Sequence, residues 1–142
     1  MSVEAHFTED HRRCDELWAA VEEVGNDPQA ASARFADFDR AMRQHFAMEE
    51  EVLFPALESA TGMRGGPTEV MRVEHAQMTR MLDAMATSIK TGEVGSALEQ
   101  GDTLLMMIQQ HNVKEESMLY PMAEHALGHT WPELAERLRK YT

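Results

Sequence analysis

Two stretches of the chain repeat one pattern of polar and apolar residues. They begin at His45 and His111 and read HFAMEEEVLFP and HNVKEESMLYP, respectively. In each, the histidine is followed four residues later by a glutamate, and the stretch ends in leucine, an aromatic residue and proline. Residues four apart on a helix project from the same face, so His45 and Glu49 present an imidazole and a carboxylate in one direction. The same holds for His111 and Glu115. Two such pairs facing each other would form a transition-metal site.

Apolar residues recur at steps of three and four along most of the chain, which predicts amphipathic helices. Turns rich in glycine and proline interrupt this pattern, and Pro55 and Pro121 are expected to bend or end two of the helices. The expected helices cover residues 8–24, 30–54, 68–91 and 96–120, with a short C-terminal helix over 131–140. Such helices predict an all-α fold, an antiparallel up-down-up-down four-helix bundle. At this length we expect residues 1–142 to form a single domain.

Two further histidines, His11 and His75, lie on the apolar faces of the first and third helices. At ~1.5 Å per residue, His11 and His45 both lie roughly 20 Å from the turn that joins their helices. The same count applies to His75 and His111. We therefore expect all four histidines to meet in one layer toward a single end of the bundle, with approximate two-fold symmetry.

The glutamates indicate that this layer binds metal. A carboxylate on a core-facing seam costs several kcal/mol to bury unless a positive group compensates it. The seams offer no lysine or arginine, and four protonated imidazoles in one layer would repel one another. Neutral imidazoles and ionised carboxylates are the species that a divalent or trivalent metal binds. The predicted metal ligands are His11, His45, Glu49, His75, His111 and Glu115.

The number of ligands narrows the choice of metal. Four histidines and two glutamates are too many for one tetrahedral zinc ion. Two metals bridged by both carboxylates would each receive two histidines and keep one or two open positions. Mixed imidazole and carboxylate ligands with open positions suit iron, which uses them for dioxygen and related small molecules. Manganese and zinc are compatible with the same ligands.

Composition argues against several other classes of function. The formal net charge is −12, from 13 Lys+Arg against 25 Asp+Glu. This balance argues against nucleic acid or an anionic membrane surface as a partner. The N-terminal sequence lacks the features of a signal peptide and no stretch approaches the length of a membrane span, so we expect a cytoplasmic protein. The single cysteine, Cys14, excludes an internal disulfide and a cysteine-based zinc finger.

The combined pattern resembles the hemerythrin-like, HHE cation-binding family. The resemblance rests on the order of the six predicted ligands, on the triplets EDH and VEH at the first and third, and on the LFP and LYP endings. It covers the chain up to the C-terminal helix. It implies a four-helix bundle that holds two non-haem iron ions, bridged by carboxylates and usually by an oxo or hydroxo group. The chain has Met71 where hemerythrins have a fifth histidine, so its pattern is more similar to the di-iron domain of the repair-of-iron-centres proteins.

The function implied by this resemblance is to bind or react with a small oxidant such as dioxygen, peroxide or nitric oxide at the open iron positions. Two alternatives stay open at this point. One is an iron storage or donor protein, which includes iron–sulfur repair, and the other is a redox or iron sensor that acts through a partner. The expected partners are the small diatomic or peroxide ligand and an electron donor or iron acceptor.

Residues beside the ligands have alternative roles. In oxygen-carrying hemerythrins the last carboxylate lies five residues after its histidine, which favours Glu116. The internal repeat and the helical face favour Glu115, which we select. Glu50 and Glu116 are then expected to be solvated or to accept hydrogen bonds from ligand imidazoles.

Three other residues lie near the predicted ligands along the seams. We expect Cys14 and Met71 to pack as core residues. Tyr120, which takes the position of Phe54 in the repeat, is expected to pack in the core with a hydrogen-bonded hydroxyl, and metal ligation or electron transfer is the alternative. Surface positions are expected for the histidines outside the seams, namely His6, His125 and His129.

Overall fold

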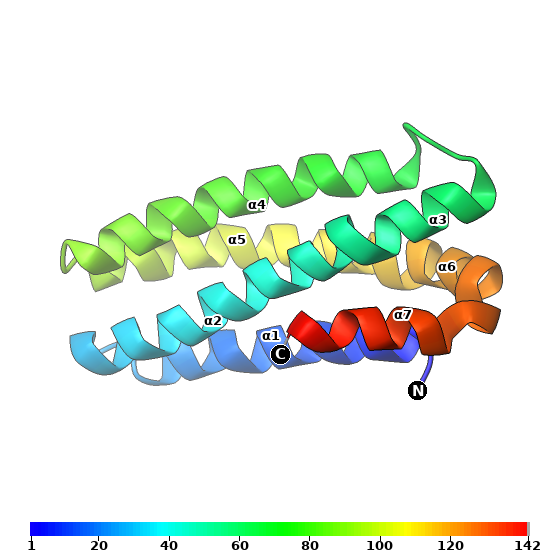
Figure 1. Cartoon of the computed structure of the whole chain (residues 1–142). Coiled ribbons are helices and arrows are strands. Elements are labelled where there is room, and N and C mark those ends of the chain that lie inside the picture. Colours follow the sequence, from blue (N-terminus) through cyan, green and yellow to red (C-terminus); the bar gives the residue numbers. More distant parts are fainter. Residues whose placement is uncertain (142) are drawn as a thin grey trace.

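The computed structural model describes residues 1–141, which form a helical bundle with no strand in that range. Four long helical stretches run alternately up and down the bundle (Figure 1). This arrangement confirms the predicted all-α, up-down-up-down bundle with a C-terminal helix. The stretches are α1 (Val3–Glu23), α2–η1–α3 (Pro28–Met48, Glu49–Leu53 and Phe54–Thr61), α4 (Pro67–Lys90) and α5–η2–α6 (Val94–Lys114, Glu115–Leu119 and Tyr120–Leu127). A short turn, η3 (Gly128–Thr130), leads to the C-terminal helix α7 (Trp131–Leu138) and to η4 (Arg139–Tyr141).

The first helix begins earlier than the sequence predicted. It starts at Val3, because the side chain of Ser2 accepts a hydrogen bond from the backbone N–H of Ala5 and caps the helix. The expected start at residue 8 is therefore wrong. The additional turn buries Val3 and Phe7 completely.

The second and fourth stretches continue through Pro55 and Pro121, where the sequence predicted that they bend or end. Proline lacks an N–H, and in an α-helix its ring clashes with the carbonyl four residues earlier. Here each proline follows a π-helical segment, η1 or η2, whose wider turn carries hydrogen bonds between residues five apart. The N–H of Phe54 thus donates to the carbonyl of Glu49, and in the fourth stretch the N–H of Tyr120 donates to the carbonyl of Glu115 in the same way. The wider turn accommodates the proline, and the helix continues.

Apolar side chains form two clusters with a polar layer between them. One cluster contains Phe7, Leu53, Phe54, Tyr120 and residues of α7, and the other contains Trp18, Phe38, Leu82 and Leu104. The histidine layer was expected toward one end of the bundle. It lies between the two clusters because the early start of α1 and the continuation past both prolines add an apolar cluster on that side.

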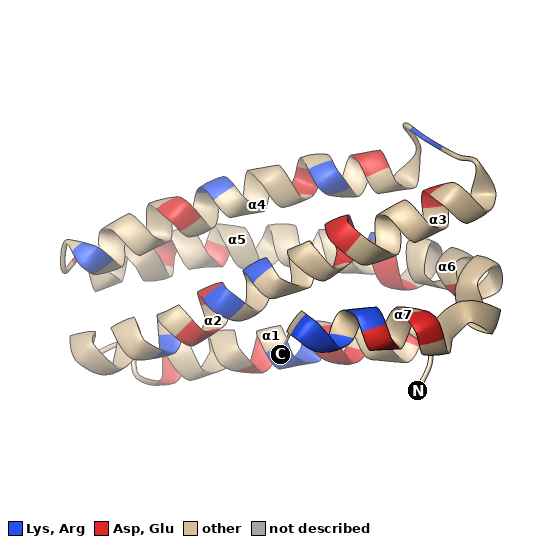
Figure 2. Cartoon of the chain, in the orientation of Figure 1, with Lys and Arg blue, Asp and Glu red and all other residues tan. Residues whose placement is uncertain are grey.

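The outer surface mixes charges of both signs. Acidic and basic residues alternate along α4 (Figure 2). No helix within residues 1–141 is long and apolar enough to cross a membrane.

Candidate metal centre

The six residues predicted as metal ligands lie together in the polar layer. Each side chain comes from the inward face of its helix, and none of the six residues is more than 4% exposed. They divide into two groups of four that share both glutamates. The groups are His11, His45, Glu49 and Glu115, and Glu49, His75, His111 and Glu115.

The two groups fit metal ions by their geometry and donor chemistry. Within each group, one ligand atom from every residue lies within 4.8 Å of all the others. The buried atoms without a hydrogen-bond partner include Glu49 Oε1, Glu115 Oε2, His75 Nε2 and His111 Nε2. His75 Nε2 lies 3.0 Å from Glu49 Oε1 and His111 Nε2 lies 3.2 Å from Glu115 Oε2, but neither contact has the geometry of a hydrogen bond. Buried polar atoms are nearly always hydrogen-bonded in proteins, and a cation bound by all four atoms would satisfy them. Glu49 and Glu115 belong to both groups.

The π-helical segments position the shared glutamates. Segment η1 begins at Glu49 and η2 begins at Glu115. The glutamate is completely buried in each case, while the next residue along the chain, Glu50 or Glu116, is partly exposed and reaches a histidine on another helix. Single π turns inside α-helices occur frequently at functional sites. In each π-helical segment of this chain, the first glutamate lies in the polar layer and the next glutamate contacts a histidine ring from outside it.

A carboxylate holds each of the four histidine rings from outside the layer. Carboxylates only accept hydrogen bonds, so each Nδ1 carries a proton and each Nε2 is left to face the layer. The pairs, with their Nδ1 to oxygen distances, are His11–Glu116 at 2.6 Å, His45–Asp10 at 2.8 Å, His75–Glu50 at 2.6 Å and His111–Glu74 at 2.8 Å. Glu50 and Glu116 therefore accept hydrogen bonds from imidazoles, which is one of the two roles that the sequence left open.

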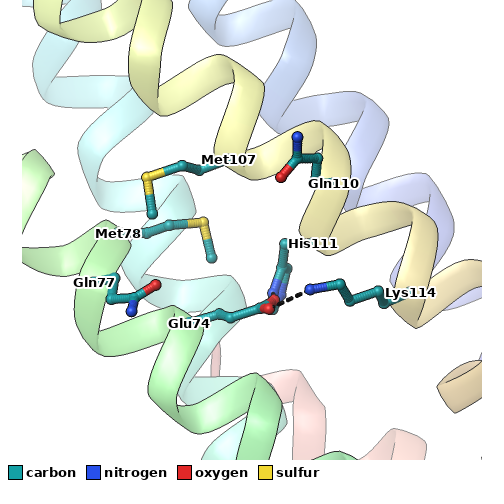
Figure 3. Close-up of a pocket in the computed structure, with 7 residues that line it drawn as sticks. All are labelled: Glu74, Gln77, Met78, Met107, Gln110, His111 and Lys114. Atoms are coloured by element: carbon teal, nitrogen blue, oxygen red, sulfur yellow. Dashed lines mark hydrogen bonds and ion pairs between the residues drawn. The ribbon is translucent and has the colours of Figure 1, made fainter.

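Sequence reasoning missed Asp10 and Glu74 in this role. The signal lay in the triplets EDH and VEH, in which an acid directly precedes a histidine. Each acid orients the histidine of the neighbouring helix and not the one beside it in the chain. Asp10 also accepts a hydrogen bond from Arg13 at 3.0 Å. Glu74 on α4 is paired with Lys114 on α5, and Figure 3 shows the two side chains reaching toward each other.

Tyr120 places its hydroxyl inside the layer. The hydroxyl donates to Glu49 Oε2 at 2.6 Å and also lies 2.9 Å from Glu115 Oε1. It contacts Nε2 of His11 at 3.0 Å and Nε2 of His45 at 3.3 Å. The expected core position with a hydrogen-bonded hydroxyl is confirmed. Burial, together with the charges of the two glutamates, raises the pKa of Tyr120 well above its usual value, so the phenol stays protonated in the absence of a cation.

Charge interactions within the layer oppose the effect of burial. Burial lowers the pKa of His75, but its interactions with the carboxylates of Glu49 and Glu50 outweigh this effect and raise the pKa to about 9. Burial likewise lowers the pKa of His45, and the negative charge of Glu49 outweighs it and raises the pKa. Burial raises the pKa of Glu115, but hydrogen bonds from histidines outweigh it and hold the pKa well below the usual value. In the metal-free protein, imidazolium groups thus compensate the buried carboxylates.

The remaining candidates lie outside the two groups. Cys14 and Met71 are buried, as expected, and burial raises the pKa of the Cys14 thiol to about 11, which keeps it uncharged. His125 and His129 are exposed. His6 was expected at the surface but is half-buried, and its ring contacts Phe7 and Trp131 because α7 packs over that end of α1.

A sequence profile of the hemerythrin HHE cation-binding domain matches residues 2–123, a range that contains both ligand groups. The chain belongs to the hemerythrin HHE cation-binding family. As an HHE domain it is a metal-binding domain, and its buried His/Glu groups are the candidate metal ligands.

One curated relative of this HHE domain is a "DNA nickase" from Nostoc sp. (strain PCC 7120 / SAG 25.82 / UTEX 2576). The two proteins are 28% identical over 129 residues, which are 90% of this chain and 35% of the relative. The chain therefore spans about a third of the length of that relative. No solved structure matches the chain.

Proposed function

We propose that this HHE domain holds two iron ions and binds or reacts with a small oxidant, namely dioxygen, peroxide or nitric oxide. The observation that carries the proposal is the pair of buried ligand groups sharing Glu49 and Glu115. Each group offers two imidazoles and two carboxylates, a mixture that suits iron and leaves coordination positions open. Bound iron supplies the redox chemistry that reaction with such oxidants requires.

The residues of the chain prepare the site in three ways. The outer carboxylates fix each imidazole with its Nδ1 protonated, so that every Nε2 is presented toward the layer. The Tyr120 hydroxyl donates a hydrogen bond to Glu49. The apolar clusters on either side keep bulk water away, which strengthens electrostatic interactions inside the layer.

Burial of the ligands favours a retained metal over a metal that is delivered elsewhere. All six ligand residues are at most 4% exposed, so release requires the bundle to open or the ligands to be protonated. We do not propose DNA nicking, the activity named for the Nostoc relative, because the net charge of −12 opposes binding of this chain to DNA phosphates.

The experiment is to load the metal-free protein with ferrous iron under anaerobic conditions and then mix it with each oxidant in a stopped-flow spectrometer. The proposal predicts near-ultraviolet charge-transfer absorption that develops in a single-turnover reaction with at least one oxidant. The zinc-loaded protein is the matched control, since zinc occupies the same ligands without redox chemistry. An iron-loaded sample whose spectrum is unchanged by dioxygen, peroxide and nitric oxide would contradict the proposal.

A further inference from the structure

We propose that small uncharged ligands, dioxygen or nitric oxide, reach the metal centre through an apolar cleft between α4 and η2. We further propose that they bind at the position held by His75 and His111, while Tyr120 closes the position held by His11 and His45. The inference rests on the proposed function, because it names where in the centre the ligand binds and how it arrives.

The two halves of the layer differ at one pair of equivalent positions in the repeat. Tyr120 directs its hydroxyl at the ring nitrogens of His11 and His45. The equivalent residue of the first half is Phe54, which has no hydroxyl and stacks on the ring of His75 at 5.7 Å between centroids and an interplanar angle of 18°. At these equivalent positions, one half places a hydroxyl beside its histidine nitrogens, and the other half places an aromatic ring without a hydroxyl. An incoming ligand therefore meets no phenol oxygen from Phe54 beside His75.

A second difference is found one helical turn before the first and third histidines. Phe7 on α1 is completely buried and packs against the ring of Tyr120. The equivalent residue on α4 is Met71, whose unbranched thioether side chain adopts alternative conformations more easily than a phenylalanine ring. Met71 precedes His75 by one turn, and it lines the inner wall of a surface cleft of about 340 Å³.

The cleft is the counterpart of the surface that α7 covers in the other half. Helix α7 packs over Phe7, Val52 and Leu53 with its residues Leu134 and Leu138. The residues equivalent to these three by the internal repeat are Met71, Met118 and Leu119, and they line the cleft together with Val70. Val70 is 49% exposed and Met118 is 53% exposed, so the cleft is open to solvent. The C-terminal helix thus seals one half and leaves the other accessible.

Two other openings near the layer are smaller than the cleft. A polar pocket between α4 and α5 ends on His111, but from the side of Nδ1, which Glu74 holds (Figure 3). The ion pair of Glu74 with Lys114 separates this pocket from the apolar cleft, since Lys114 lines both. A chamber beside Cys14 and Met78 is lined by three of the ligand histidines, His11, His45 and His111, but it has space for only roughly one water molecule, which is too little for an entry route.

The walls of the cleft select the chemistry of the ligand. They are apolar, so a small uncharged molecule partitions into them, whereas a charged ligand would lose its hydration without compensation. Dioxygen and nitric oxide have this character. Peroxide and other strongly hydrated ligands are expected to enter this route more slowly.

Xenon tests the route independently of iron chemistry, because this atom binds in dry apolar cavities of the size of small gases. Crystals of the zinc-loaded full chain under xenon pressure should show xenon in the cleft against Met71. The Val70→Trp variant, which fills the mouth, should lose that xenon site. Absence of xenon from the cleft in the unmodified chain would overturn the inference.

The kinetic test uses the iron-loaded protein and nitric oxide. Val70→Trp and Met118→Trp should slow the association of nitric oxide by about tenfold or more, with metal content unchanged. Val73→Trp is the matched control, since Val73 lies one turn further along α4, is 51% exposed and does not line the cleft. Normal association rates in both blocking variants would overturn the route. A dimer of the unmodified chain that dissociates on Val70→Trp would also overturn it, because the cleft would then bind a second copy.

A reciprocal pair of variants tests the binding position. Phe54→Tyr brings a hydroxyl to the open half and should weaken nitric oxide binding at equilibrium by about tenfold or more, at unchanged metal content. Tyr120→Phe removes the hydroxyl from the closed half and should allow a second equivalent of nitric oxide to bind. Equal binding by Phe54→Tyr and the unmodified protein would overturn the assignment. If the unmodified iron protein binds no oxidant at all while xenon fills the cleft, the proposed function fails and the cleft remains a gas-binding site.

Discussion

Oε2 of Glu50 lies 2.6 Å from Nδ1 of His75, although the two residues belong to opposite halves of the repeat. Glu116 crosses in the reverse direction to His11, also at 2.6 Å. Each half of the chain thus orients a histidine of the other half. The metal centre depends on the packing of the two halves, in addition to the ligands that each half supplies.

Glu50→Gln should weaken metal binding by about 10- to 100-fold, because the amide removes the charge that stabilises the protonated Nδ1 of His75 and supports its basicity. Chelator competition on the variant and on the unmodified chain measures the change. Glu99→Gln provides the control for loss of one negative charge, since Glu99 is exposed and lies on α5 away from the layer. Equal affinities in the two variants would show that the Glu50–His75 contact does not tune the centre.

Removal of a ligand should remove metal. His45→Ala and Glu49→Ala should each lose at least one metal ion per chain, because the first group then retains only three of its four ligands and the second group shares Glu49. His129→Ala should retain full metal content, since this exposed histidine belongs to neither group. Elemental analysis of the three purified variants measures the metal content per chain. Equal metal content in all three would contradict the ligand assignment.

The spacing of polar residues on apolar helical faces was sufficient to select the six residues that the structure brings together. The spacing of three and four residues follows from helix geometry alone, so the sequence shows it directly. The internal repeat aligned Glu115, not Glu116, with Glu49, and both Glu115 and Glu49 are completely buried. The fold class followed from the same periodicity. The helix bounds were less accurate, because a proline in sequence does not reveal that a preceding π turn can accommodate it.

Contacts that depend on packing between helices were not predictable from the sequence. Asp10 and Glu74 precede histidines in the chain but orient different histidines, which only the crossing of neighbouring helices determines. The approach of the Tyr120 hydroxyl to His11 and His45 also depends on how η2 widens the turn before it. The difference between the two halves therefore emerged only from the structure.

Metal affinity should rise with pH up to about pH 9. In the metal-free protein the pKa of His75 is about 9 and that of His45 is also raised, so protons compete with the metal at neutral pH. Calorimetry at about pH 7 in buffers of different ionisation enthalpy should show proton release on binding. Affinity that is constant between about pH 6 and pH 9 would contradict the raised pKa values of these two histidines.

The stability of the metal-free protein should fall as the pH rises, whereas metal affinity should increase. A histidine whose folded pKa lies above its unfolded value of 6.5 contributes stability that is fully present below pH 6.5 and is lost as the pH rises through about 9. The melting temperature of the metal-free chain should therefore fall between about pH 6.5 and pH 9.5. His75→Gln should show a smaller fall over the same interval. A melting temperature that rises over this interval would contradict the assignment.

Gly101 is required by the close approach of Trp18. A Cβ at this position would lie 2.2 Å from two atoms of the Trp18 ring, a distance that forces the ring or the helix to move. Gly101→Ala should therefore destabilise the bundle by about 1–3 kcal/mol. Gly95→Ala is the matched control, because the added Cβ would meet no side chain of another part of the bundle within 4 Å and alanine favours a helix by roughly 0.5–1 kcal/mol. Denaturant unfolding that gives the two variants equal stability would contradict the close packing of Trp18 against Gly101.

Metal content per chain tests the central claim most directly. The protein is purified without a metal-binding tag, loaded anaerobically with ferrous iron, freed of excess metal and analysed by elemental mass spectrometry alongside its absorption spectrum. Two buried groups that share Glu49 and Glu115 predict about two irons per chain and near-ultraviolet charge-transfer absorption after exposure to air. One metal per chain, or none, would contradict a two-metal centre and leave the histidines and glutamates as a polar layer of the core.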